Sequence, residues 1–145
     1  MRPQRGGVKR DKTDALFSEL VRERANWVCE YCKRDLTHDR GRLHCSHHFG
    51  RRNRGIRYHP LNASAHCIGC HQILGDEPIM FGEWVKDKLG DEDYAWLLLE
   101  ANRATKLYDS EKEELHRHYL AERRRMRALR SDGETGPIEF TYLGG

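Results

Sequence analysis

Three histidines and a cysteine lie close together in the stretch LHCSHHFGRR, which spans residues 43–52 and ends in two arginines. Histidine titrates near neutral pH, so it can serve as a general base or, when neutral, as a metal ligand. Arginine binds phosphate oxygens. The stretch therefore suits metal binding, acid–base chemistry or a plain solvated surface, and the residues around it have to discriminate among these.

Two C-x2-C pairs flank this stretch, Cys29 with Cys32 and Cys67 with Cys70. Each pair places two thiolates at one turn, and four thiolates satisfy the tetrahedral coordination of a closed structural zinc site. We therefore predict a structural Zn²⁺ on these four residues. The fifth cysteine, Cys45, is left over and is expected to be a packed thiol on a strand.

The composition indicates a small hydrophobic core and a highly charged surface. The chain has 145 residues, of which 37% are apolar and 34% charged, with a net charge of +3. This length favours one domain, and a metal would help to stabilise it. Basic residues cluster in separate segments, which suits an anionic polymer. The sequence shows no signal peptide and no membrane-spanning run, so we expect a cytoplasmic protein with no membrane partner.

The elements expected to position the histidines are short. A helix is predicted from Thr13 to about residue 27, followed by strands over 42–48 and 55–59 and by a helix from Asn62 to Gly75. Three more helices are expected over 80–89, 91–106 and about 110–129. For the last, basic helix we favour a solvated amphipathic surface over a DNA-gripping or homodimer helix.

The order of these residues resembles a known family. Asn62, Cys67, Cys70 and His71 form N-x4-C-x2-C-H, with the His47–His48 pair upstream. The segment from Cys29 to about Gly75 resembles the zinc-stapled HNH endonucleases and, within them, the phage NinG-type recombination endonucleases.

The resemblance implies an α+β fold with a small ββα-metal HNH core, stapled by the four-cysteine zinc site and flanked by α-helices. The nuclease core would span 13–78. From the sequence pattern itself we expect a flexible basic arm at 1–12, a helical extension at 79–130 and a tail at 131–145; the resemblance covers neither the arm nor the tail. The implied activity is metal-dependent hydrolysis of phosphodiester bonds in DNA, branched or structured, during phage recombination.

The resemblance also implies roles for the histidines. His71 would be a ligand of the catalytic divalent ion, Mg²⁺ or Mn²⁺ with Zn²⁺ or Ni²⁺ as alternatives, and Asn62 would hold the loop that carries the base. Adjacent strand residues point to opposite faces, so His47 and His48 cannot share one task. Either His47 is the base, or His47 binds the ion with His48 as the base. We favour His47 as the base. The family pattern then has Ser46 at a position where an Asp is usual. The catalytic ion would therefore lack a second protein ligand, which His48 would have to supply.

Four arginines between the motif residues are expected to bind DNA phosphates: Arg51, Arg52, Arg54 and Arg57. Two alternatives remain open. The protein could be a non-catalytic, zinc-dependent nucleic-acid-binding module, or an HNH nuclease of restriction, homing or DNA-packaging type.

Overall fold

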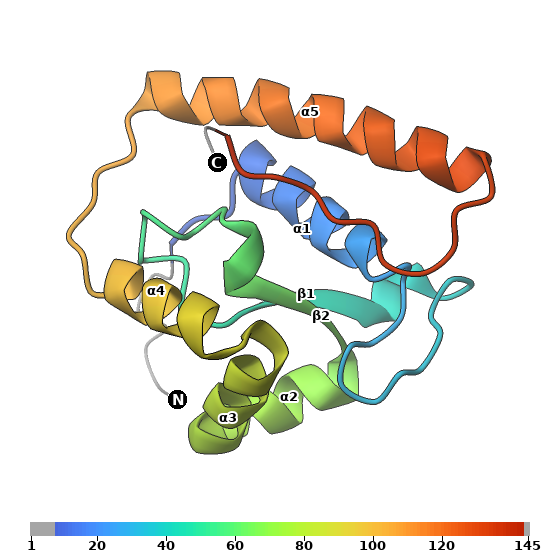
Figure 1. The fold of residues 1–145 in the computed structure, drawn as a ribbon, viewed down its shortest axis with the longest axis horizontal. Coiled ribbons are helices and arrows are strands. Elements are labelled where there is room, and N and C mark those ends of the chain that lie inside the picture. Colours follow the sequence, from blue (N-terminus) through green and yellow to red (C-terminus); the bar gives the residue numbers. More distant parts are fainter. Residues whose placement is uncertain (1–7, 144–145) are drawn as a thin grey trace.

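Two short antiparallel strands lie at the centre of the fold (Figure 1). The computed structural model describes residues 8–143. Strand β1 spans Leu43–His47 and strand β2 spans Ala63–Cys67. Leu43 pairs with Cys67 and His47 pairs with Ala63, so the end of β1 that carries His47 lies beside the start of β2.

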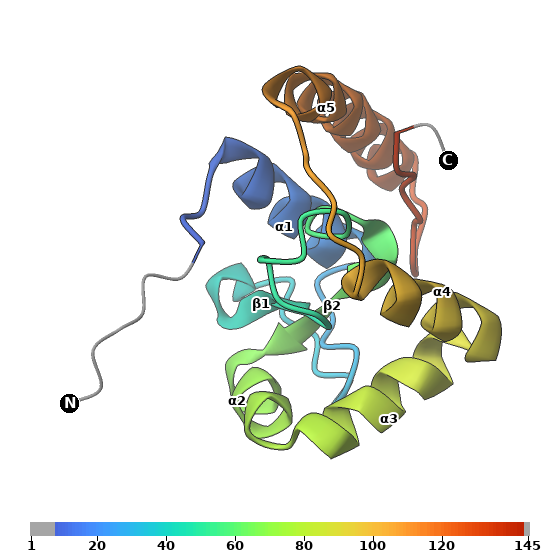
Figure 2. The same cartoon turned by 90° about the vertical axis from the view of Figure 1, so that its left-hand side faces the viewer.

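Helix α1 (Lys12–Arg24) and helix α5 (Asp109–Ser131) lie in successive layers over one face of this sheet, and both figures show α1 between α5 and the strands (Figures 1 and 2). Helix α1 starts at a capping box, in which the side chains of Asp11 and Asp14 each accept a hydrogen bond from the other's backbone N–H. The helix therefore begins one residue before the predicted start at Thr13, with Asp11 as its N-cap.

Three helices follow β2 on the other side of the sheet: α2 (Ile68–Asp76), α3 (Pro78–Leu89) and α4 (Asp91–Ala101). Gly90 separates the last two with a φ of 83°, a left-handed conformation that favours glycine. Short 3-10 turns at Arg40–Arg42 and Pro60–Asn62 lead into the two strands. The predicted helices over the second half of the chain are present with shifts of a few residues.

The predicted second strand and the helix start at Asn62 are both wrong. Residues 55–59 form turns, and the segment that pairs with β1 is 63–67, whose five residues are all buried. A short, fully buried strand has no polar alternation, so its sequence cannot be told from the start of a buried helix. The helix begins only after Cys67, whose sulfur caps it by accepting from the backbone N–H of Cys70.

Helix α5 is part of the core. Its Leu115, Tyr119 and Met126 are buried against α1, as are Ile138 and Phe140 of the segment that follows α5. The helix that was expected to be a solvated surface thus has one face packed in the core. The described part of the expected tail is also packed against the core, through Ile138 and Phe140. Of the arm predicted for residues 1–12, positions 1–7 lie outside the described residues, whereas Asp11 caps α1 and Lys12 is its first residue. No helix among the described residues is long and apolar enough to cross a membrane.

Candidate functional site

The four predicted zinc ligands meet at one point. The sulfur atoms of Cys29, Cys32, Cys67 and Cys70 all lie within 4.8 Å of one another, and Cys32 Sγ is 3.8 Å from Cys67 Sγ. Cys29, Cys67 and Cys70 are buried, whereas Cys32 is exposed. This cluster could hold a structural metal ion.

Backbone N–H groups donate hydrogen bonds to two of these sulfurs, which stabilises the thiolate form. The N–H of Cys32 donates to Cys29 Sγ at 3.5 Å, and the N–H of Cys70 donates to Cys67 Sγ at 3.4 Å. Burial raises the pKa of the Cys29 thiol, but backbone donors, Cys32 first, outweigh it and lower the pKa to about 7. Burial and the neighbouring thiols raise the pKa of Cys70. Four crowded thiols therefore favour a bound cation, which lets all of them ionise.

The first cysteine turn is fastened directly to the sheet. Glu30 pairs with Ala65 of β2, donating its backbone N–H at 2.8 Å and accepting from the Ala65 N–H through its carboxylate at 2.6 Å. Lys88 of α3 binds the same carboxylate at 2.7 Å. The first cysteine turn is thus bonded both to β2 and to α3.

A cavity of about 600 Å³ opens along the outer edge of β1. It is lined by histidines, basic residues and the start of α1: Arg10, Asp14, Ser18, Arg22, Gly41, Leu43, His44, Cys45, His47, Gly50, Arg51 and His71. His47 and His71, which come from different elements, therefore face one solvent-accessible space.

His47 has one ring nitrogen committed and one available. Its Nε2 lies 3.0 Å from the backbone carbonyl of Arg57. Since a carbonyl oxygen only accepts, Nε2 carries the hydrogen and Nδ1 keeps its lone pair. Burial lowers the pKa of His47 below the usual 6.5, so the ring is neutral, as a general base must be.

His48 has both ring nitrogens committed. Its Nδ1 donates to the Leu61 carbonyl at 2.9 Å, and its Nε2 accepts from the Ser64 hydroxyl at 2.7 Å. Ser64 in turn accepts from Lys88 at 2.6 Å. Burial holds the pKa of His48 well below 6.5, and His48 does not line the cavity.

His71 lies in the first turns of α2 and faces β1. Its Nδ1 is 2.5 Å from the Ser46 hydroxyl, and its ring centroid is 5.5 Å from that of His44. Burial, with the adjacent His44, lowers the pKa of His71, which keeps the imidazole neutral and able to bind a metal.

Asn62 is completely buried and ties together the loop between the strands. Its Oδ1 accepts from the Phe49 N–H at 2.8 Å, and its Nδ2 donates to the carbonyls of Phe49 at 2.9 Å and Ile56 at 3.1 Å. The amide therefore holds both ends of the segment 49–56.

The four arginines expected to bind phosphate are in different environments. Arg52 and Arg54 are exposed, and Arg51 lines the cavity. Arg57 departs from the expectation, because its guanidinium is buried and paired with Asp14 through two hydrogen bonds. A buried, paired guanidinium is not presented to a DNA backbone.

Asp14 was not among the residues singled out from the sequence, although it lies in the cavity beside His47. The D-K-T-D segment that begins at Asp11 carries a capping signal that could have located it at the start of α1. Its partner Arg57, by contrast, is 43 residues away along the chain, and no local signal predicts that pair.

Comparisons of the chain with protein-family models, curated proteins and solved structures found no match. The function must therefore be inferred from the site itself.

Proposed function

We propose that the protein is a metal-dependent DNA endonuclease of HNH type, with β1, β2 and α2 as its ββα-metal core and His47 as its general base. The observation that carries the proposal is the cavity beside β1, which is lined by both His47 and His71 and by the basic side chains of Arg10, Arg22 and Arg51. Such a surface attracts a phosphodiester backbone.

His47 is the better of the two candidate bases because its Nδ1 keeps a lone pair and His47 lines the cavity. In the reaction, Nδ1 removes a proton from water, the water oxygen bonds to phosphorus, and the bond from phosphorus to the leaving 3′ oxygen breaks. Both nitrogens of His48 already have protein partners, so its role is to hold β1 against β2.

The catalytic ion is proposed to bind at His71, next to the Ser46 hydroxyl and the His44 ring. The donors fit a divalent ion that accepts imidazole, because the ring centroids of His44 and His71 lie 5.5 Å apart there. When bound, the ion would stabilise negative charge on the phosphate and the leaving oxygen. With serine in place of a carboxylate, this set favours Ni²⁺ or Zn²⁺ over Mg²⁺ or Mn²⁺.

For the cysteine cluster we propose Zn²⁺. A tetrahedron with zinc–sulfur bonds of about 2.3 Å has edges of about 3.8 Å, and Cys32 Sγ lies 3.8 Å from Cys67 Sγ. The ion's role is to hold the first cysteine turn against β2 and the start of α2.

The test is a cleavage assay with supercoiled, linear and four-way-junction DNA in Mg²⁺, Mn²⁺, Ni²⁺ or Zn²⁺. We expect cleavage that falls about 10²–10⁴-fold in His47→Ala, the range for loss of a general base. The control is His38→Ala, an exposed histidine outside the cavity, which should cleave normally.

Preferential cutting of the junction would support the recombination role, and equal cutting of all DNA would count against it. If the wild-type protein binds DNA but cuts none with any ion, the nuclease proposal is rejected in favour of a zinc-dependent nucleic-acid-binding module.

A further inference from the structure

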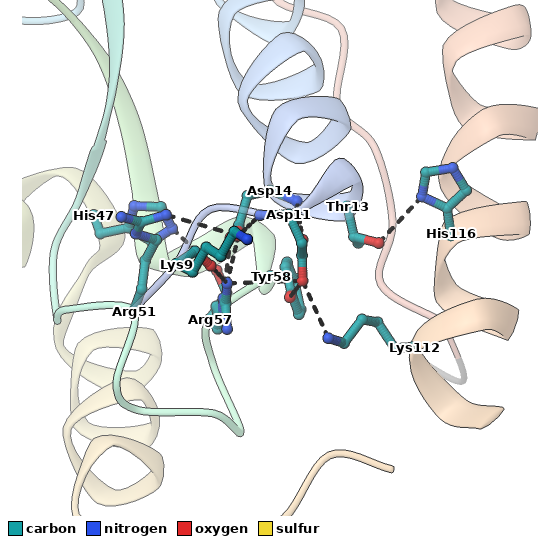
Figure 3. Close-up of polar contacts among 10 residues, drawn as sticks. All are labelled: Lys9, Asp11, Thr13, Asp14, His47, Arg51, Arg57, Tyr58, Lys112 and His116. Carbon is teal, nitrogen blue, oxygen red and sulfur yellow. Dashed lines mark hydrogen bonds and ion pairs between the residues drawn. The ribbon is translucent and has the colours of Figure 1, made fainter. Parts of the chain in front are cut away.

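A buried ion pair connects α1 to the loop behind His47 (Figure 3). Arg57 Nε donates to Asp14 Oδ1 at 3.0 Å, and Arg57 Nη2 donates to Asp14 Oδ2 and, at 2.9 Å, to the Lys9 carbonyl. The Asp14 side chain is 3% exposed and that of Arg57 10%. A two-point guanidinium–carboxylate contact fixes orientation as well as distance.

The backbone of the same arginine touches the proposed base. The carbonyl of Arg57 accepts the hydrogen of His47 Nε2 at 3.0 Å. This contact sets which ring nitrogen carries the hydrogen and how the ring is turned. The position of one carbonyl thus decides whether Nδ1 has a lone pair to offer to water.

The residue after Arg57 is anchored to the same helix start. The Tyr58 hydroxyl donates to Asp11 Oδ2 at 2.8 Å, and Lys112 of α5 donates to that oxygen at 3.1 Å. Tyr119 of α5 donates to the Tyr58 carbonyl. Asp11 and Asp14 also form the capping box of α1. The position of residues 57–58 therefore depends on the first turn of that helix.

We propose that Asp14 is a positioning residue for His47: by clamping the Arg57 side chain, it holds the Arg57 carbonyl where that carbonyl keeps the hydrogen on Nε2. The inference rests on the proposed function, in which His47 is the base. Asp14 does not act on the substrate, because its carboxylate is buried against Arg57.

The direct test is Asp14→Asn, which keeps the side-chain volume and an oxygen for the cap but removes the charge that holds Arg57. Arg51 Nη1 also lies 3.7 Å from Asp14 Oδ2, so the state of the His47 ring, which Arg51 does not contact through this pair, is the deciding measurement. We expect single-turnover cleavage to fall about tenfold or more, since small misplacements of catalytic groups cost up to about 10²-fold. We also expect ¹⁵N NMR of the rings to show that His47 no longer carries its hydrogen solely on Nε2. The His47 signals are assigned as those missing in His47→Gln.

The matched control is Glu23→Gln, which disrupts a pair of similar burial away from the cavity. Arg130 Nε lies 3.6 Å from Glu23 Oε1, with side chains 15% and 14% exposed. This variant should keep the His47 tautomer and the cleavage rate. If Asp14→Asn does not fold, Arg57→Lys takes its place, because it keeps the carbonyl and the charge but loses the two-point contact.

Wild-type cleavage and an unchanged His47 tautomer in Asp14→Asn would overturn the inference while leaving His47 as the base. A tautomer shift in a protein whose wild type cuts no DNA would reject the nuclease and still support the role of Asp14 in orienting the ring.

Discussion

His47 and His48 are neighbours in sequence, but they have opposite surroundings. His47 lines the cavity and packs against Phe17 of α1, with ring centroids 5.7 Å apart. His48 lies on the other face of β1, where its ring meets Phe81 and Trp84 of α3. Strand alternation produces this split, and the hydrogen bonds of each ring then define what it can do.

We therefore predict that His48→Ala lowers the free energy of unfolding and leaves the rate of DNA cleavage nearly unchanged. The change leaves the Leu61 carbonyl and the Ser64 hydroxyl without their partner, which costs about 1–3 kcal/mol for a buried polar group. Urea unfolding should show this loss, whereas the folded variant should cleave DNA at a rate near that of the wild type. A variant of normal stability with no cleavage would instead assign the base to His48.

At the scale of elements, the cysteine cluster joins two parts of the chain that are also connected by the hydrogen bonds between Glu30 and Ala65. The turn after α1 supplies Cys29 and Cys32, and the junction of β2 with α2 supplies Cys67 and Cys70. That junction also carries His71, so the cluster fixes the helix that presents His71 to β1.

Removal of the metal should therefore unfold this part of the molecule. We expect one tightly bound zinc per chain by elemental analysis and a large fall in Tm with a strong chelator, because the binding energy of a structural zinc is also folding energy. Cys70→Ser should lose the metal. Cys45→Ser is the matched control, since Cys45 lies outside the cluster and burial raises its pKa to about 12. Loss of zinc in the control variant would contradict the assignment.

At the scale of the whole molecule, the layers are held together by side chains that bridge distant segments. His59, from the loop before β2, stacks on Tyr142 at 4.9 Å and lies 4.7 Å from Trp96 of α4, measured between ring centroids. Burial lowers the pKa of His59 to about 4, although Asp93 opposes the shift. Three parts of the chain thus meet at a ring that must stay neutral.

This predicts an acid-sensitive fold. In the unfolded chain His59 titrates near 6.5, so below that pH the unfolded state binds the proton more readily than the folded state. Its contribution to stability is complete above about 6.5 and is lost as the pH falls towards 4. Urea unfolding across this range should show a shallower decline for His59→Asn. His59 Nδ1 accepts from the Leu61 N–H at 3.1 Å, and the asparagine oxygen can accept the same hydrogen bond. Equal slopes for both proteins would refute this role.

Local sequence alone determined the cysteine cluster and most helices. The C-x2-C spacing places two sulfurs at one turn whatever the rest of the fold does, and Gly90 ends a helix because of its own backbone freedom. The same local logic failed at residues 63–67, where burial on both faces removes the alternation that identifies a strand.

Only the tertiary structure decided the roles of His47, His48 and Arg57. Alternation along the chain required that the two histidines face opposite ways, but which of them lines the cavity depends on how α1 and α3 pack against the sheet. The sequence predicts that Arg57 binds phosphate like the neighbouring arginines, but in the fold its guanidinium pairs with Asp14. Contacts between residues far apart in the chain leave no local pattern, so these assignments had to come from packing.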